Sequence, residues 1–114
     1  MKTLDSLTIS ENERAAVVRA RETLTADLPV SRVVLFGSRA RGQGDRYSDI
    51  DLLVLTSCPV NSKLRRDVSD RLAEINLQSD VMLSSVVVSE KDWSQGLVRY
   101  MLIHSEVEKD GCEV

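Results

Sequence analysis

Residues 33–55, VVLFGSRARGQGDRYSDIDLLVL, decide how the chain is expected to fold. The stretch contains two apolar runs, Val33–Phe36 and Ile50–Leu55, and each is typical of a strand that is buried on both faces. A Gly-Ser turn, a short arginine-containing loop and a pair of aspartates lie between the apolar cores of the two runs. The pattern predicts two neighbouring strands joined by a loop that carries polar, chemically active side chains.

Asp49 and Asp51 stand at the entrance of the second run, two residues apart. Because side chains alternate along a strand, both carboxylates project from the same face, about 6.6 Å apart along it. A carboxylate in a buried strand is costly unless something pairs with it. Hard cations such as Mg²⁺ prefer oxygen ligands of this kind. The aspartate pair therefore predicts a metal site.

Gly37 and Ser38 come directly after the first run and predict a phosphate site. A glycine lets the backbone turn sharply and bring N–H groups close to an anion, and the serine hydroxyl adds a donor. Arg39 and Arg41 leave two interpretations open. Their guanidinium groups suit triphosphate oxygens, but they can equally pair with local acids or stay solvated.

The spacing of these residues resembles a known motif. Gly37-Ser38, ten intervening residues and then Asp49-Ile50-Asp51 resemble the Gly-Ser…Asp-x-Asp motif of the polymerase-beta-type nucleotidyltransferase superfamily. The longer stretches LFGSRARG and SDIDLLV are similar to its minimal nucleotidyltransferase (MNT) branch. The resemblance implies an α/β fold with a mixed sheet flanked by helices. It also implies ATP as nucleotide donor, Mg²⁺ as cofactor, and catalytic, metal-binding roles for the two aspartates.

A third strand is expected from the stretch Ser79–Leu83 into Ser84–Val88, with Asp80 at its start. The preceding helix is long enough to cross over and return the chain beside the second strand. In the resembling family a third acidic residue on a neighbouring strand completes the catalytic and metal-binding set, and Asp80 is the candidate for that role. The alternative is an aspartate that ends a turn, because Asp is common at such boundaries.

The remaining elements follow from caps and breakers. Ser10 and Glu13 form a capping-box pattern that opens a helix ending at about Asp27. Asn61 or Ser62 caps a second helix that ends at about Leu77. A last helix of about fifteen residues is expected after the capping pattern at Ser89, with Gly111 as its stop. Residues 1–9 are expected to be irregular, and the single histidine, His104, to be a packing residue.

Composition restricts the possible functions. The 114 residues suit one domain, expected over residues 1–114, and a net charge of −3 provides no bulk attraction to nucleic acid or to an anionic membrane. Cys58 and Cys112 have no metal-ligand spacing, and the amino terminus has no long apolar run. We expect a soluble cytoplasmic protein without a signal peptide that does not bind nucleic acid directly.

The resemblance also implies a partner. Minimal nucleotidyltransferases are the antitoxin half of two-component systems, paired with a helical HEPN-domain ribonuclease toxin, and relatives transfer AMP from ATP to a tyrosine of that toxin. Two other functions stay open. One alternative is a binding module that neutralises its partner by covering it. The other is a nucleotidyltransferase that acts on a small molecule such as an aminoglycoside. The small-molecule alternative is disfavoured because larger relatives seat such an acceptor in a second domain, for which this chain has no room.

Overall fold

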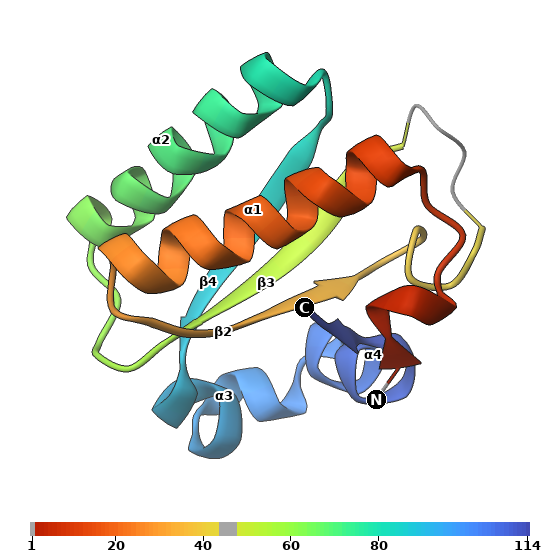
Figure 1. Ribbon diagram of the computed structural model, residues 1–114. Helices are drawn as coiled ribbons and strands as arrows, with labels where there is room; N and C mark the ends of the chain where they lie inside the picture. The colour runs from red at the N-terminus through yellow and green to blue at the C-terminus, as the bar shows by residue number, and fades with distance from the viewer. Residues whose placement is uncertain (1, 44–47) are drawn as a thin grey trace.

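A computed structural model of the chain describes residues 2–43 and 48–114. Its centre is a mixed sheet with the strand order β1-β5-β2-β3-β4 (Figure 1). The strands are β1 (Lys2–Thr3), β2 (Val30–Phe36), β3 (Ile50–Thr56), β4 (Leu83–Ser89) and β5 (Cys112–Glu113). The helices are α1 (Glu11–Asp27), α2 (Ser62–Ser79), α3 (Glu90–Gln95) and α4 (Leu102–Asp110), with 3₁₀ turns η1 (Leu4–Ser6) and η2 (Leu97–Tyr100). The predicted α/β fold, a mixed sheet flanked by helices, is confirmed.

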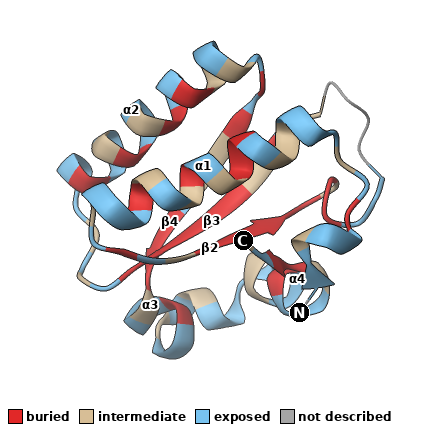
Figure 2. Cartoon of the chain, viewed as in Figure 1, coloured by how far each residue is buried: buried red, intermediate tan, exposed pale blue. Residues whose placement is uncertain are grey.

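Helices cover both faces of the sheet. Figure 1 shows α1 and α2 on one side and α3 and α4 on the other. Strands β2 and β3 are therefore almost entirely buried, as Figure 2 shows. Side chains of alternating parity enter the two cores: Val33 and Leu35 pack under α1 and α2, whereas Val34 and Phe36 pack against α3 and α4. This is why the two strands read as continuous apolar runs.

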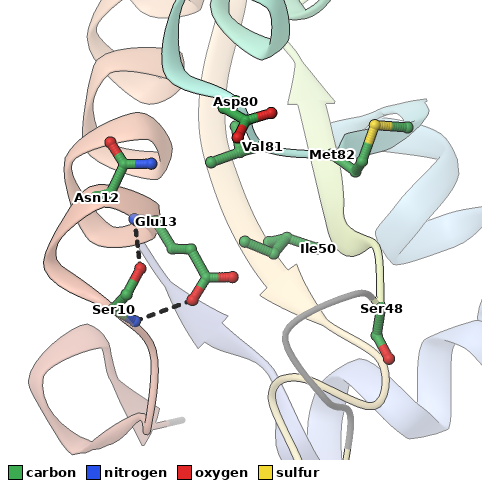
Figure 3. Close-up of a pocket in the computed structure, with 8 residues that line it drawn as sticks. All are labelled: Ser10, Asn12, Glu13, Ser48, Ile50, Asp80, Val81 and Met82. Atoms are coloured by element: carbon green, nitrogen blue, oxygen red, sulfur yellow. Dashed lines mark hydrogen bonds between the residues drawn. The ribbon is translucent and has the colours of Figure 1, made fainter.

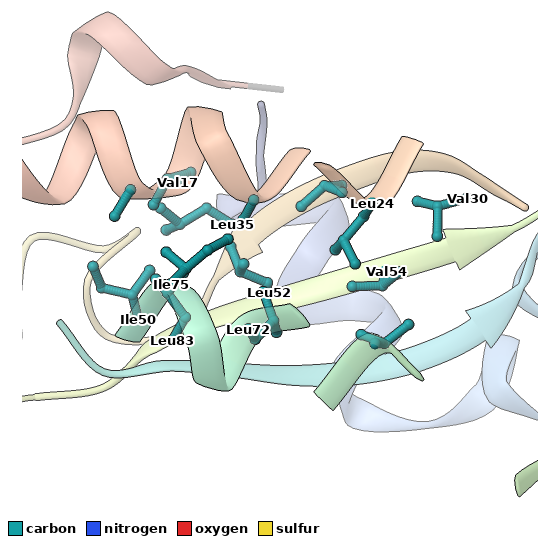
Figure 4. Packing of buried hydrophobic residues seen from close by; sticks show 14 of the residues in the cluster. Val17, Leu24, Val30, Leu35, Ile50, Leu52, Val54, Leu72, Ile75 and Leu83 are labelled. Atoms are coloured by element: carbon teal, nitrogen blue, oxygen red, sulfur yellow. The ribbon is translucent and has the colours of Figure 1, made fainter. Parts of the chain in front are cut away.

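The larger core lies between the sheet and α1 and α2 (Figure 4). Leu24 from α1, Leu72 and Ile75 from α2, and Leu35 and Leu52 from the sheet are all nearly inaccessible to solvent. The apolar stripe of each helix therefore points inward, and most of the charged residues of α1 and α2 face solvent. No helix in the described ranges is long and apolar enough to cross a membrane.

Pairing directions bring three strand ends to one edge of the sheet. Strands β2 and β3 are antiparallel, with Phe36 opposite Asp51, and α2 crosses over so that β4 runs parallel to β3. The carboxyl end of β2 therefore lies beside the amino ends of β3 and β4. The residues that the sequence singles out at 37–38 and 49–51 are at this edge.

Local helix signals behave as the sequence predicts. The Ser10 hydroxyl accepts a hydrogen bond from Glu13 N–H, and the Glu13 carboxylate accepts one from Ser10 N–H, which completes the capping box of α1. Asn61 caps α2 in the same way, through Leu64 N–H. Gly111 follows the last residue of α4. These signals depend on neighbours within one turn, so the sequence is enough to predict them.

Two expectations about the chain ends are wrong. Residues 2–3 are not irregular but form β1, which pairs in parallel with β5 at the other end of the chain. The single last helix is instead broken: α3 ends at Gln95, and Gly96 and η2 separate it from α4. Glycine is a poor helix residue. The break lets Val98 and Ile103 pack on the smaller core, which lies between the sheet and α3 and α4. His104 stacks on the buried Trp93, with ring centroids 4.6 Å apart, as expected of a packing residue.

Candidate active site

Asp49 and Asp51 lie where β3 begins, on the edge that also carries the end of β2. Asp49 is exposed and precedes the strand, and Asp51 is half-buried as its second residue. Asp51 has the same parity as Leu53 and Leu55, which pack in the core under α3 and α4. The carboxylate of Asp51 therefore projects on the α3 and α4 side of the sheet, beyond the part that those helices cover.

The Asp51 carboxylate lies directly against the Gly-Ser turn. Gly37 has a φ of +81°, and a Cβ built on it would collide with Asp51 Oδ2 and lie 3.3 Å from Asp51 Cγ. Glycine is thus required at this position for its conformation and for the space it leaves. The other carboxylate oxygen, Oδ1, accepts a hydrogen bond of 2.7 Å from the Ser84 hydroxyl on β4. The structure therefore brings Gly37 and Asp51 together, as the motif predicts.

Residues 37–43 form consecutive tight turns. Ala40 N–H and Arg41 N–H both donate to Gly37 C=O, and Gln43 N–H donates to Ser38 C=O. The bond from Arg41 N–H spans four residues, so residues 37–41 form one helix-like turn. Ser38 is half-buried at the start of the turn, and it directly follows Gly37, the residue that lies against Asp51.

The two arginines of the turn have different environments. Arg39 is only 5% exposed; its guanidinium donates to Glu13 Oε2 on α1 at 2.6 Å and to Ser48 C=O at 3.2 Å. Pairing with a local acid, the second interpretation left open by the sequence, is therefore the one seen for Arg39. Arg41 is exposed and hydrogen-bonded to the side chain of Gln43. The guanidinium of Arg41 therefore has no acidic partner among the described residues, and the choice between phosphate binding and solvation stays a prediction for Arg41.

Glu13 responds to this pairing. Burial acts to raise its pKa, but the hydrogen bond from Ser10 N–H and the Arg39 guanidinium outweigh burial, so the pKa of Glu13 lies below its usual value of 4.5. The carboxylate is thus charged at neutral pH and holds Arg39 in place. Through Arg39, the turn that follows β2 is connected both to α1 and to the residue before Asp49.

Asp80 does not lie where the sequence predicted. It is the C-cap of α2, in the left-handed conformation with φ 53° and ψ 49°, and it precedes the first residue of β4 by three positions. Its side chain is exposed at a cavity of about 520 Å³, which Ile50 and residues of α1 also line (Figure 3). Ile50 packs in the core under α1 and α2, so this cavity is on the side of the sheet opposite to Asp51.

The expected position of Asp80 on the neighbouring strand is therefore corrected. An aspartate tolerates the left-handed conformation at a helix end better than most residues, which is the turn-ending alternative. The residue of β4 in register with Asp51 is Ser84, which the sequence analysis missed. Its only signal is the polar pair Ser84-Ser85 within an apolar strand.

The carboxylates of this edge suit a magnesium ion that takes some of its ligands from the protein and the others from a substrate. No cluster of three or more metal-ligating side chains occurs in residues 2–43 and 48–114. Mg²⁺ is commonly held by one or two carboxylates together with waters and substrate phosphates. Asp49 and Asp51, beside a turn that suits phosphate, are of this type. The edge thus places two carboxylates beside a Gly-Ser turn, which is the combination that the sequence analysis associates with nucleotidyltransferases.

Comparison with known proteins agrees with that class. The sequence model described as "Nucleotidyltransferase domain" matches residues 17–110, and the chain belongs to this family. "Putative protein adenylyltransferase MJ0141" of Methanocaldococcus jannaschii is 31% identical over 85 residues, which are 75% of this chain and 79% of the relative. "Probable protein adenylyltransferase MntA" of Haemophilus influenzae is 27% identical over 109 residues, which are 96% and 93% of the two chains. The chain is a nucleotidyltransferase, and the predicted resemblance to the minimal branch is confirmed.

Solved structures agree on the fold. A toxin–antitoxin complex with AMP-PNP contains a chain that matches with a TM-score of 0.59 at 19% identity, over 91% of this chain and 72% of the other. The complex of the tri-AMPylated Shewanella oneidensis HEPN toxin with its MNT antitoxin matches with a TM-score of 0.57 at 20% identity, over 89% and 70%. At these identities the likeness supports the architecture alone.

The contact between Gly37 and Asp51 leads to the first prediction. Gly37→Ala is expected to lower the free energy of unfolding in urea by more than the roughly 1–2 kcal/mol that a left-handed alanine costs, because its Cβ also displaces Asp51. Gly42→Ala is the matched control: its φ is +72°, and a Cβ there meets no described atom within 4 Å. Equal losses in the two variants would show that the approach of Asp51 is unimportant.

The Arg39–Glu13 ion pair leads to a second prediction. Glu13→Gln keeps a residue suited to the capping box but removes the charge. Because the pKa of Glu13 is lowered in the folded state, its charge stabilises the fold above about pH 4.5, and that contribution is lost as the pH falls through the lowered value. The difference in unfolding free energy between wild type and E13Q should be full at pH 6–7 and shrink below about pH 4.5. A difference independent of pH would contradict this account.

Proposed function

We propose that this nucleotidyltransferase transfers AMP from ATP to a hydroxyl group, a tyrosine, of a partner protein, and that the reaction needs Mg²⁺. The partner is a HEPN-type ribonuclease toxin, and the chain is its antitoxin. The observation that carries the proposal is the contact of the Asp51 carboxylate with the turn at Gly37, which supports a metal ligand beside a phosphate-binding segment. The relatives described as protein adenylyltransferases support the acceptor class.

The proposed reaction is an in-line displacement at the α-phosphorus of ATP. A bond forms from the acceptor oxygen to the α-phosphorus, the bond from the α-phosphorus to the bridging oxygen of the β-phosphate breaks, and pyrophosphate leaves. Mg²⁺ at Asp49 and Asp51 would supply charge stabilisation for the attacking and leaving oxygens. Hydrogen-bond donors of the Gly37-Ser38 turn hold phosphate oxygens, and Arg41 neutralises their charge. The acceptor proton leaves through the exposed Asp49 carboxylate to solvent.

A protein acceptor also fits an exposed feature of the surface. Leu97, Tyr100, Met101 and Leu102, here called the apolar segment, are all more than half exposed. Exposed groups of large apolar side chains often mark protein–protein contacts. The segment joins α3 to α4, on the side of the sheet from which Asp51 projects. A protein that contacts the apolar segment is therefore on the side where the proposed transfer takes place.

Transfer would neutralise a ribonuclease by a simple electrostatic effect. Each AMP adds a phosphate and an adenosine, which places bulk and negative charge where the enzyme must admit RNA. Repulsion of the RNA backbone then continues after the two proteins separate. A binding module that acts by covering predicts the opposite: inhibition that follows complex formation and disappears on dilution.

A third prediction tests the reaction itself. The chain, a HEPN-type ribonuclease from the same genome, ATP and Mg²⁺ are mixed, and the intact mass of the ribonuclease is measured. Wild type should add one or more AMP units, and Asp51→Asn should lower the rate on the order of 10²–10³-fold because a charged group of the transition-state environment is lost. The thermal stability of D51N should be unchanged or raised, because a pair of like charges is relieved. No mass shift, with full neutralisation by D51N, would leave the binding module as the function.

A fourth prediction tests the protein acceptor. Leu102→Glu places a charge in the apolar segment, where the wild-type side chain is 80% exposed, so folding should be unaffected. We expect weaker binding to the partner and slower transfer, with ATP binding in the presence of Mg²⁺ unchanged. Leu77→Glu is the matched control, because Leu77 is 87% exposed but lies on α2, on the other side of the sheet. Equal effects of the two substitutions would argue against a role for the apolar segment.

A further inference from the structure

Among the described residues, the Ser84 hydroxyl is the only group of another strand that donates a hydrogen bond to a predicted metal ligand. It donates to Asp51 Oδ1 at 2.7 Å. The contact follows from the parallel register of β3 and β4, in which Ser84 is paired with Asp51. Because paired residues of neighbouring strands direct their side chains to the same face, the hydroxyl and the carboxylate lie side by side.

The backbone beside Ser84 is hydrogen-bonded on both sides. On one side β4 pairs with β3 along its whole length, from Leu83 to Ser89. On the other side, Asn76 of α2 accepts from Leu83 N–H at 2.9 Å and donates to Leu83 C=O at 3.1 Å. The residue before Ser84 is therefore bound from both directions, although β4 is an edge strand. The backbone pairing fixes the position of the Ser84 Cα relative to Asp51.

The opposite side of the carboxylate is also restricted. Asp51 Oδ2 occupies the space that a side chain at position 37 would need. The carboxylate is thus held between the Ser84 hydroxyl and the backbone of the Gly37 turn. In this orientation Oδ1 is engaged by the serine, and Oδ2 faces the segment proposed to bind phosphate.

We propose that Ser84 is a positioning residue that orients the Asp51 carboxylate for Mg²⁺ and ATP. The inference rests on the proposed function of the site and names a residue that the motif does not contain. Groups that orient the ligands of a metal typically change metal affinity or activity by about 10–100-fold when they are removed. The serine hydroxyl is neutral, so it leaves the negative charge of Asp51 unchanged. It donates to Oδ1 and leaves Oδ2 available to a metal ion.

The next residue supplies an internal control. Ser85 is also half-buried on β4, but successive side chains of a strand point to opposite faces. Ser85 has the parity of Leu83 and Val87, which pack in the core under α1 and α2, so its side chain faces α2. It lines a small cavity there with Leu72, Ala73 and Asn76, and Ser84 of the same strand also borders this cavity. Removing its hydroxyl is the same chemical change, one position along the strand and on the other side of the sheet from Asp51.

The experiment compares Ser84→Ala, Ser84→Thr and Ser85→Ala in the full chain. Binding of Mn²⁺ together with AMP-PNP is measured by calorimetry, and crystal structures of the metal-free variants give the orientation of Asp51. S84A should bind Mn²⁺ with AMP-PNP about 10-fold more weakly, and its Asp51 carboxylate should rotate away from the wild-type position. S84T, which keeps the hydroxyl and suits a strand, should restore both, and S85A should match wild type. In the transfer assay S84A should lower kcat/KM by a similar factor.

The possible failures are distinguishable. Wild type that binds neither Mn²⁺ nor AMP-PNP would overturn the proposed function and this inference with it. Wild type that binds both, with S84A equal to it in affinity and in the orientation of Asp51, would overturn the role of Ser84 alone. Equal losses in S84A and S85A would also overturn it, because the effect would then belong to the strand and not to the hydroxyl beside Asp51.

Discussion

The pairing of β2 with β3, with Phe36 opposite Asp51, is the constraint on which the site depends. This register places Gly37 over the Asp51 carboxylate and sets the direction in which the aspartate projects. A slip of one residue would turn Asp51 toward the core under α1 and α2, where an unpaired carboxylate is costly. In the middle of the two strands both faces are apolar, so a shifted register would cost little there. The polar residues at the strand ends therefore specify the register.

A second interaction holds the turn in that geometry. The guanidinium of Arg39 is buried between Glu13 of α1 and the carbonyl of Ser48, so the turn is joined to the helix layer and to the start of β3 at once. A further hydrogen bond, from the Lys2 ammonium to Ala40 C=O, joins it to the amino-terminal strand. Because a buried charge that loses its partner is strongly unfavourable, the pair fixes the conformation of the turn more than it adds stability. The turn is thus prepared before any ligand arrives.

The two faces of the sheet have different roles: one provides most of the core, and the other carries the candidate site. The larger core, under α1 and α2, contributes most of the apolar burial. The smaller core, under α3 and α4, covers only part of its face and leaves the edge with Asp51 and Ser84 accessible. Asp80 is on the first side and Asp51 on the second, which is why two aspartates at the same edge of the sheet do not meet. The proposed contact of a partner with the apolar segment and the proposed position of the acceptor beside Asp51 are on the same side of the molecule.

The sequence by itself determined whatever depends on near neighbours. The caps at Ser10 and Asn61, the two apolar strands, and the close approach of the Gly37 turn to Asp51 follow from local patterns and from a motif of fixed spacing. Only the tertiary structure decided which distant groups pair: β1 with β5, Arg39 with Glu13, and Ser84 rather than Asp80 beside Asp51. The position of Asp80 turned on where β4 begins, which is Leu83 and not Asp80, and the role of Ser84 turned on the register of β4. Each is set by packing across the sheet, because the free energy of these contacts depends on residues that are far apart in the chain.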